Sequence, residues 1–219
     1  MIEIKNLLDT SKTIAKDIFC DKTYPYEVLP LISEFIIDLQ KKLDKDCFNV
    51  INENIYIHKS VKVYETANIF GPCIIDENTE VRPGAFIRGN AVIGKNCVVG
   101  NSTEIKNVII FDNVQVPHYN YVGDSILGYK SHMGAGSITS NVKSDKTLVV
   151  VKDGDKLYET GLKKMGAVLG DNVEVGCNSV LNPGTVIGRN TNVYPLSSVR
   201  GAVPENSIYK SSDNIVKKY

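Results

Sequence analysis

The stretch ANIFGPCIIDENTEVRPGAFIRGNAVIGKNCVVGNSTEI, residues 67–105, decides the fold, because an aliphatic β-branched residue recurs in it every six positions. Followed from further upstream, this column comprises Ile57, Val63, Ile69, Ile75, Val81, Ile87, Ile93, Val99 and Ile105. A second column, two residues earlier, holds only small or β-branched residues: Val61, Ala67, Cys73, Thr79, Ala85, Ala91, Cys97 and Thr103. A period of six excludes an α-helix or a coiled coil. The repeat predicts short strands joined by tight turns, three to a triangular coil.

The same pattern resumes near the C-terminus with Leu169, Val175, Leu181, Ile187, Val193 and Val199. Stacked coils would lie about 4.8 Å apart, as neighbouring strands of a sheet do. A glycine follows many of the column residues, at 94, 100, 123, 128, 134, 170, 176 and 188, and we expect these glycines to supply unusual backbone angles at the corners. Two steps of five, Ile105 to Ile110 and Val122 to Leu127, interrupt the repeat, and such departures often mark functional segments. We therefore predict a mainly β protein, a parallel β-helix over residues 51–205.

Three segments lie outside the repeat. Residues 1–50 place Leu29, Leu31, Ile32, Phe35, Ile36 and Leu39 at helical spacing, which predicts a small helical cap over the open end of the coil. Residues 143–165 contain Asp153-Gly154, a hairpin turn signal, and predict an inserted β-hairpin loop projecting from the coil; a disordered excursion is the alternative. Residues 206–219 are expected to form a tail that extends away or packs on a neighbour.

The amino-acid composition indicates which binding partners and which cellular compartment to expect. The 25 basic residues balance the 25 acidic ones, so no global field would attract nucleic acid or an anionic membrane. The five cysteines include no C-x-x-C pair and are odd in number, which argues against a zinc knuckle or a disulfide framework. No signal core or long apolar run is evident. We expect a cytoplasmic protein.

Irregular motifs between residues 82 and 141 carry a family resemblance. They are Arg-Pro-Gly at 82–84, Glu104-x-Lys106, His118-x-x-Tyr121-x-Gly-Asp, and Gly134-Ala-Gly136-x-Ile-Thr-x-Asn141. Over roughly residues 55–205 the chain resembles the C-terminal acetyltransferase domain of bifunctional N-acetylglucosamine-1-phosphate uridyltransferase/glucosamine-1-phosphate N-acetyltransferase, one of the hexapeptide-repeat acyltransferases. Nothing resembles that family's nucleotidyltransferase half, so no pyrophosphorylase activity is expected.

The resemblance implies a left-handed β-helix, a homotrimer, and CoA-dependent transfer of an acetyl group to an amine. The acceptor would be a sugar phosphate such as glucosamine-1-phosphate or a related nucleotide sugar. Acetyl-CoA would be the donor, and no metal would be required. His118 matches the family's general base, a role that suits imidazole because its pKa lies near neutrality.

The remaining candidate residues also follow from the resemblance. The substrate-binding candidates are Arg82, Lys106, Tyr121, His132, Asn141 and Lys164. The first two are cations that suit a phosphate, and His132 replaces an asparagine of the family. The cofactor-binding candidates are Ala135, Gly136, Cys177, Pro195 and Lys210. Small residues at 135–136 would let the backbone approach the donor and steady the thioester oxyanion.

Two alternatives remain open on the residues alone. One is a binding protein that keeps the sugar-phosphate site without turnover, which His132 and the insertion at 143–165 motivate. The other is a metalloenzyme on the same scaffold, similar to the γ-class carbonic anhydrases. Its zinc would need His58, His118 and His132 to converge across subunits.

Overall fold

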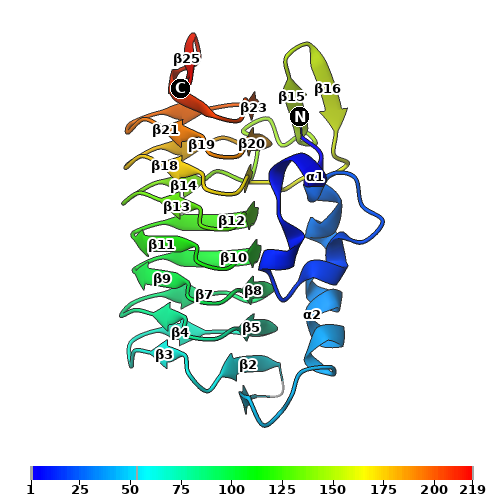
Figure 1. Ribbon diagram of the computed structural model, residues 1–219, viewed down its shortest axis with the longest axis vertical. Helices are drawn as coiled ribbons and strands as arrows, with labels where there is room; N and C mark the ends of the chain where they lie inside the picture. The colour runs from blue at the N-terminus through cyan, green and yellow to red at the C-terminus, as the bar shows by residue number, and fades with distance from the viewer. Residues whose placement is uncertain (1, 53, 219) are drawn as a thin grey trace.

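The computed structural model describes residues 2–52 and 54–218 and shows a parallel β-helix with a helical segment along one flank (Figure 1). The sequence prediction of stacked parallel coils is confirmed. Ile57, Ile75 and Ile93 face one another in register on successive coils, as the period of six requires. The aliphatic column fills the interior, and from Ile75 to Ile105 none of its side chains is exposed.

Three faces make up the coil. The first comprises β4 (Asn68–Ile69), β7 (Phe86–Ile87), the start of β10 (Glu104–Ile110) and of β12 (Tyr121–Leu127), β14 (Ile138–Thr139), β19 (Val180–Leu181) and β22 (Ser198–Val199). The second comprises β2 (Ile55–His58), β5 (Cys73–Ile75), β8 (Ala91–Ile93), the ends of β10 and β12, β17 (Ala167–Leu169), β20 (Thr185–Ile187) and β23 (Ala202–Val203). The third comprises β3 (Lys62–Val63), β6 (Glu80–Val81), β9 (Val98–Asn101), β11 (Gln115–His118), β13 (His132–Met133), β18 (Glu174–Val175), β21 (Asn192–Val193) and β24 (Ser207–Ser211).

Three edges join these faces, and we name each by one residue. The His118 edge, between the third and first faces, contains the turns at 82–84, 100–102, 117–120, 134–136, 176–178 and 194–196. The Asn141 edge, between the first and second faces, contains those at 88–90, 140–142, 182–184 and 200–201. It also contains the corners that β10 and β12 make at 106–107 and 123–124, where Asn107 and Asp124 have a positive φ within the strands. The Asp76 edge, between the second and third faces, contains those at 58–60, 76–78, 94–96, 111–113, 128–130, 170–172 and 188–190.

The prediction that the glycines after the column residues supply unusual backbone angles was wrong. None of the eight glycines that follow column residues has a positive φ; asparagines take the left-handed conformation instead, as Asn78, Asn96 and Asn113 do on the Asp76 edge. The glycines are needed because the next coil passes too close for a Cβ. A Cβ at Gly100 would lie 1.6 Å from the carbonyl oxygen of Pro117.

The N-terminal segment covers the second face rather than the open end of the coil, so the predicted position of the cap was wrong. It contains α1 (Ile4–Leu7), α2 (Ile32–Gln40) and three 3-10 turns, η1 (Thr10–Lys12), η2 (Lys16–Phe19) and η3 (Pro25–Leu31). Helix α2 packs against β5, β8 and β10 (Figure 1). The strands beneath are apolar on both sides. Their outward side chains Ile74, Val92, Ile109, Ile126 and Val168 are fully buried, each contributing about 1.5–3 kcal/mol relative to exposure.

Polar contacts fix this segment on the flank. The amide Nε2 of Gln40 donates to the carbonyl oxygen of Cys73 (3.1 Å), and the backbone N–H of Asp9 donates to a carboxylate oxygen of Asp171 (2.8 Å). The chain then reaches the coil through β1 (Phe48–Ile51), which pairs antiparallel with β2. None of the helices within residues 2–52 and 54–218 has the length and apolar character that a membrane crossing demands.

The insertion forms the expected hairpin, β15 (Val150–Asp153) and β16 (Lys156–Glu159), with Gly154 at positive φ in the turn. Its base is docked, because Val149 and Val151 are fully buried and the ring of Tyr158 lies 5.5 Å from that of Tyr24. Residues 206–219 were predicted to form a tail, but within the described residues they continue the sheet. β24 pairs with β21, and β25 (Asn214–Lys217) folds back antiparallel on β24.

Candidate functional site

The candidate donor-binding residues line up on the His118 edge. The backbone N–H of Asn178 donates to the carbonyl oxygen of Ala135 (2.8 Å), and that of Leu196 donates to Cys177 (2.9 Å). These bonds stack the turns at 134–136, 176–178 and 194–196, which places Ala135, Cys177 and Pro195 on successive coils. The ammonium group of Lys210 lies 5.7 Å from the ring centroid of Tyr194 on the same edge. The fold therefore brings this set of candidates together.

His118 belongs to the same edge, one coil below Ala135. Its carbonyl oxygen accepts the N–H of Gly136 (3.0 Å), and its own N–H donates to Oδ1 of Asn120 (3.1 Å). The His118 side chain is exposed, and among the described residues it has no hydrogen-bond partner. The imidazole is thus free to meet a ligand while its backbone is held on both sides.

Asn120 is a positioning residue that the sequence reasoning missed. Its carboxamide is buried and donates to the carbonyl oxygens of Gly134 (2.8 Å) and Ser137 (3.1 Å) while accepting from His118. One side chain therefore ties the His118 turn to the turn that contains Ala135 and Gly136. The only signal in the sequence was an amide inside Pro-His-Tyr-Asn-Tyr.

Arg82 lies two coils below the His118 turn on this edge. The backbone N–H of Arg82 donates to Val99, and Asn101 pairs in register with His118. Two coil steps amount to about 10 Å. The guanidinium of Arg82 donates to the carboxylate of Glu80 (3.1 Å) and is one-third exposed. It shares the edge with His118 without touching it.

A second group of candidates lies on the Asn141 edge. The amide Nδ2 of Asn141 donates to Oδ2 of Asp124 (2.5 Å) and to the hydroxyl of Tyr121 (3.2 Å). Asn107 donates to the other oxygen of Asp124 (2.9 Å). Burial, and secondarily the charge of Asp124, raises the pKa of the Tyr121 phenol. Asp124, which the sequence analysis quoted within a motif but gave no role, therefore fixes the orientation of the Asn141 amide.

Lys106 also belongs to the Asn141 edge, where it pairs in register with Gly123. Tyr121 begins the first-face strand that connects the two edges, three residues after His118. The first face is narrow, since strands such as β14 and β19 contain two residues each. A ligand on this face could meet His118 at one edge and Asn141 at the other.

The two remaining substrate-binding candidates are His132 and Lys164. His132 is on the third face, where its Nδ1 lies 2.8 Å from a carboxylate oxygen of Glu174 on the next coil. Lys164 is exposed at the end of the insertion and directly precedes Met165, whose backbone N–H donates to the carbonyl oxygen of Asn141 (3.0 Å). The fold therefore places Lys164 beside the Asn141 turn, whereas it leaves His132 on the third face.

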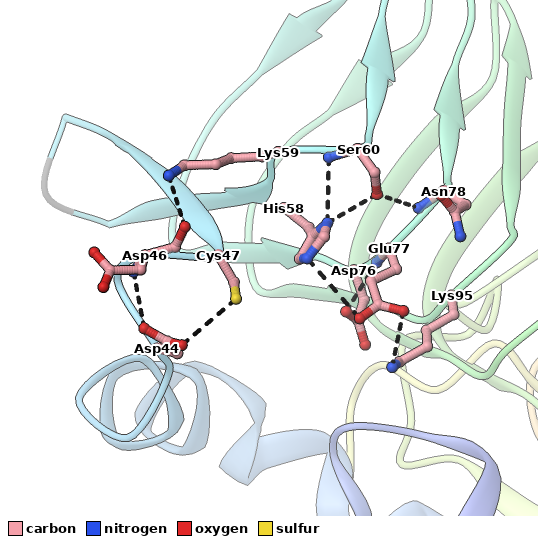
Figure 2. Close-up of polar contacts among 10 residues, drawn as sticks. All are labelled: Asp44, Asp46, Cys47, His58, Lys59, Ser60, Asp76, Glu77, Asn78 and Lys95. Atoms are coloured by element: carbon pink, nitrogen blue, oxygen red, sulfur yellow. Dashed lines mark hydrogen bonds and ion pairs between the residues drawn. The ribbon is translucent and has the colours of Figure 1, made fainter.

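The third histidine, His58, lies on the Asp76 edge. Its Nδ1 is 2.8 Å from the hydroxyl of Ser60, and its Nε2 is 3.9 Å from the carboxylate of Glu77 (Figure 2). His58, His118 and His132 therefore occupy different parts of one chain. In residues 2–52 and 54–218, no three His, Cys, Asp or Glu side chains lie close enough together to hold a metal ion.

Stacked parallel coils with a six-residue period define a hexapeptide-repeat protein. Residues 69–203 match the family described as the GMPPB C-terminal domain, and the chain belongs to that family. It is also similar to bifunctional GlmU proteins, as its motifs indicate. It is 34% identical over 222 residues to that of Methanococcus vannielii, covering 98% of this chain and 53% of the relative.

The GlmU protein of Methanocaldococcus jannaschii is 33% identical over 201 residues, covering 89% of this chain and 48% of the relative. The chain thus spans about half the length of the curated relatives it matches. Among solved structures, the acetyltransferase domain of PglB from Neisseria gonorrhoeae, in complex with acetyl coenzyme A, is 13% identical with a TM-score of 0.34, covering 74% of this chain and 56% of that one.

Proposed function

We propose that this chain is an acyltransferase that moves an acetyl group from acetyl-CoA to the amine of a sugar phosphate or nucleotide-linked sugar. One observation carries the proposal: Gly136 donates to the carbonyl oxygen of His118. A candidate base therefore lies on the same edge as Ala135, Cys177 and Pro195, one coil below Ala135. The similarity of this chain to bifunctional GlmU proteins supports the same reaction class.

In the proposed reaction the amine nitrogen attacks the thioester carbonyl carbon. The C–S bond breaks as the new C–N bond forms, and the amine proton passes to His118 and then to the CoA thiolate. A base placed in this way contributes about 10²–10⁴ in rate. The small residues Ala135 and Gly136 leave room for the pantetheine arm, and a backbone N–H on this edge would steady the thioester oxygen.

Acceptor binding is assigned to the first face and its two edges. Arg82 and Lys106 would bind the phosphate, while Tyr121 and Asn141 would orient the sugar through hydroxyl and amide groups. The network around Asp124 fixes the Asn141 amide before any ligand arrives. We propose a homotrimer, in which a neighbouring chain would close the site; light scattering should then report three times 24.1 kDa.

The experiment is a CoA-release assay with a panel of amino-sugar phosphates and nucleotide-linked amino sugars. We expect turnover with at least one acceptor and a loss of about 10²–10⁴ in kcat for His118→Gln. His58→Gln, a histidine on the Asp76 edge, is the matched control and should retain activity. Saturable sugar binding without CoA release would instead indicate a binding protein, and full activity in His118→Gln would reject the assigned base.

A further inference from the structure

A basic groove lies on the Asn141 edge, between the coil and the inserted hairpin. It consists of two adjoining cavities of ≈ 380 and ≈ 570 Å³ that share Lys152, Arg200 and Gly201. Their other polar lining residues are Ser140, Lys143, Ser144 and Asn182 in the first, and Ser198, Tyr209 and Ser212 in the second. No carboxylate is among the described residues that line either cavity.

The hairpin wall of this groove is built into the fold. A Cβ at Gly184 would lie 2.9 Å from Cγ1 of Val149, and one at Gly201 would lie 2.7 Å from the carbonyl oxygen of Lys152. The hairpin backbone therefore rests directly on two successive turns of the edge. With Val151 fully buried beneath it, Lys152 is held over the turn that carries Arg200.

The two shared cations differ from the other arginines in their contacts within residues 2–52 and 54–218. Each of the other three arginines pairs with a carboxylate at 2.6–3.2 Å: Arg82 with Glu80, Arg88 with Glu104, and Arg189 with Asp171. Arg200 and Lys152 form no ion pair within the described parts of the chain. Lys143 contributes less because it pairs with Asp145 at 3.3 Å. Two exposed cations facing one groove suit an anion with several oxygens, and arginine suits phosphate in particular.

We propose that this groove binds the pyrophosphate group of a nucleotide-bearing ligand. The cations lie where the two cavities adjoin, so the charged centre of the ligand would sit there with an organic group extending into each side. Ser140 lines one end of the groove and immediately precedes Asn141. The groove is distinct from the proposed acyl-transfer centre on the His118 edge. Residues of the inserted hairpin form one of its walls. Both a nucleotide-linked sugar and CoA contain a pyrophosphate, and the test separates them.

The test is calorimetric titration of the full chain with UDP, with CoA and with inorganic pyrophosphate. We expect Lys152→Gln and Arg200→Gln each to weaken binding of one nucleotide probe by roughly tenfold, and Arg200→Lys to weaken it less. Lys156→Gln, on the other strand of the same hairpin and outside both cavities, is the matched control. The probe whose binding the substitutions weaken, UDP or CoA, identifies which ligand supplies the pyrophosphate.

Binding is measured without turnover, so this result is independent of the proposed reaction. The substituted side chains are exposed, and unchanged thermal unfolding would confirm that the variants fold. The proposal is overturned if no probe binds the wild-type chain. It is equally overturned if the double variant Lys152→Gln/Arg200→Gln binds every probe as the wild type does.

Discussion

Replacing Asp76 with asparagine is expected to stabilise the protein at neutral pH. The side chain is 3% exposed, and its Oδ1 accepts the backbone N–H of Glu77 (2.8 Å). Its Oδ2 is buried without a partner among the described residues, because the nearby Lys95 ammonium pairs with Glu77 instead (Figure 2). A buried, unsatisfied acceptor costs about 1–3 kcal/mol, and more when charged.

The pH dependence follows from the same burial, which raises the pKa of the Asp76 carboxyl. Since the folded pKa lies above the unfolded value, the folded state holds the proton more tightly. Stability associated with this group is complete below about pH 3.9 and is lost as pH rises through the folded pKa. The Asp76→Asn variant has no such loss, although the unpaired amide that it introduces offsets part of the gain. We expect a net stabilisation of about 1 kcal/mol at pH 7.

Urea unfolding at pH 7 and at pH 4 measures both effects. In a chain of this size, 1 kcal/mol corresponds to about 2–4 °C in Tm, so thermal scans give a second readout. Asp46→Asn, an exposed carboxylate nearby, is the control and should show no comparable gain. A difference between Asp76→Asn and wild type that is equal at both pH values would refute the reasoning, as would a destabilised variant at pH 7.

Three further predictions follow from the geometry. Gly100→Ala should destabilise the fold by about 1–3 kcal/mol or more and displace the Pro117 turn, which lowers activity as well; an unfolding free energy equal to wild type would contradict this. Asp124→Ala leaves two amides without their shared acceptor and should cost about 3 kcal/mol while raising KM for the acceptor, as unfolding and kinetic assays would report. Acetyl-CoA should protect Cys177 but not Cys47, both exposed thiols, from iodoacetamide in a mass-spectrometric assay; equal labelling of both would argue against the donor site on the His118 edge.

The coil was predictable because its interior repeats in the sequence with one period. The packing of the N-terminal segment along the second face was harder to predict. Every third hexad has apolar residues on both sides of the strand, as in Ala91-Val92-Ile93, and the outward Val92 must then be covered by something. The sequence contains that signal, but it does not show which segment provides the cover, because the partners are far apart along the chain.

In the candidate site, too, the sequence predicted some residues and not others. Motif residues on one edge were found together, because stacking places residues of successive coils above one another. Asn120 and Asp124 were given no role, because the hexad repeat shows which residues stack but not which side chains bond across one coil step, as these do to Ser137 and Asn141. A hydrogen bond between coils leaves no periodic trace in the sequence, so only coordinates reveal it.

The most direct test of the account is a crystal structure of the full chain with acetyl-CoA bound. We predict density for the donor along the His118 edge, across Ala135 and Cys177, with the thioester within reach of the His118 imidazole. A donor bound along the Asp76 edge, or a thioester remote from His118 in every chain of the assembly, would contradict it.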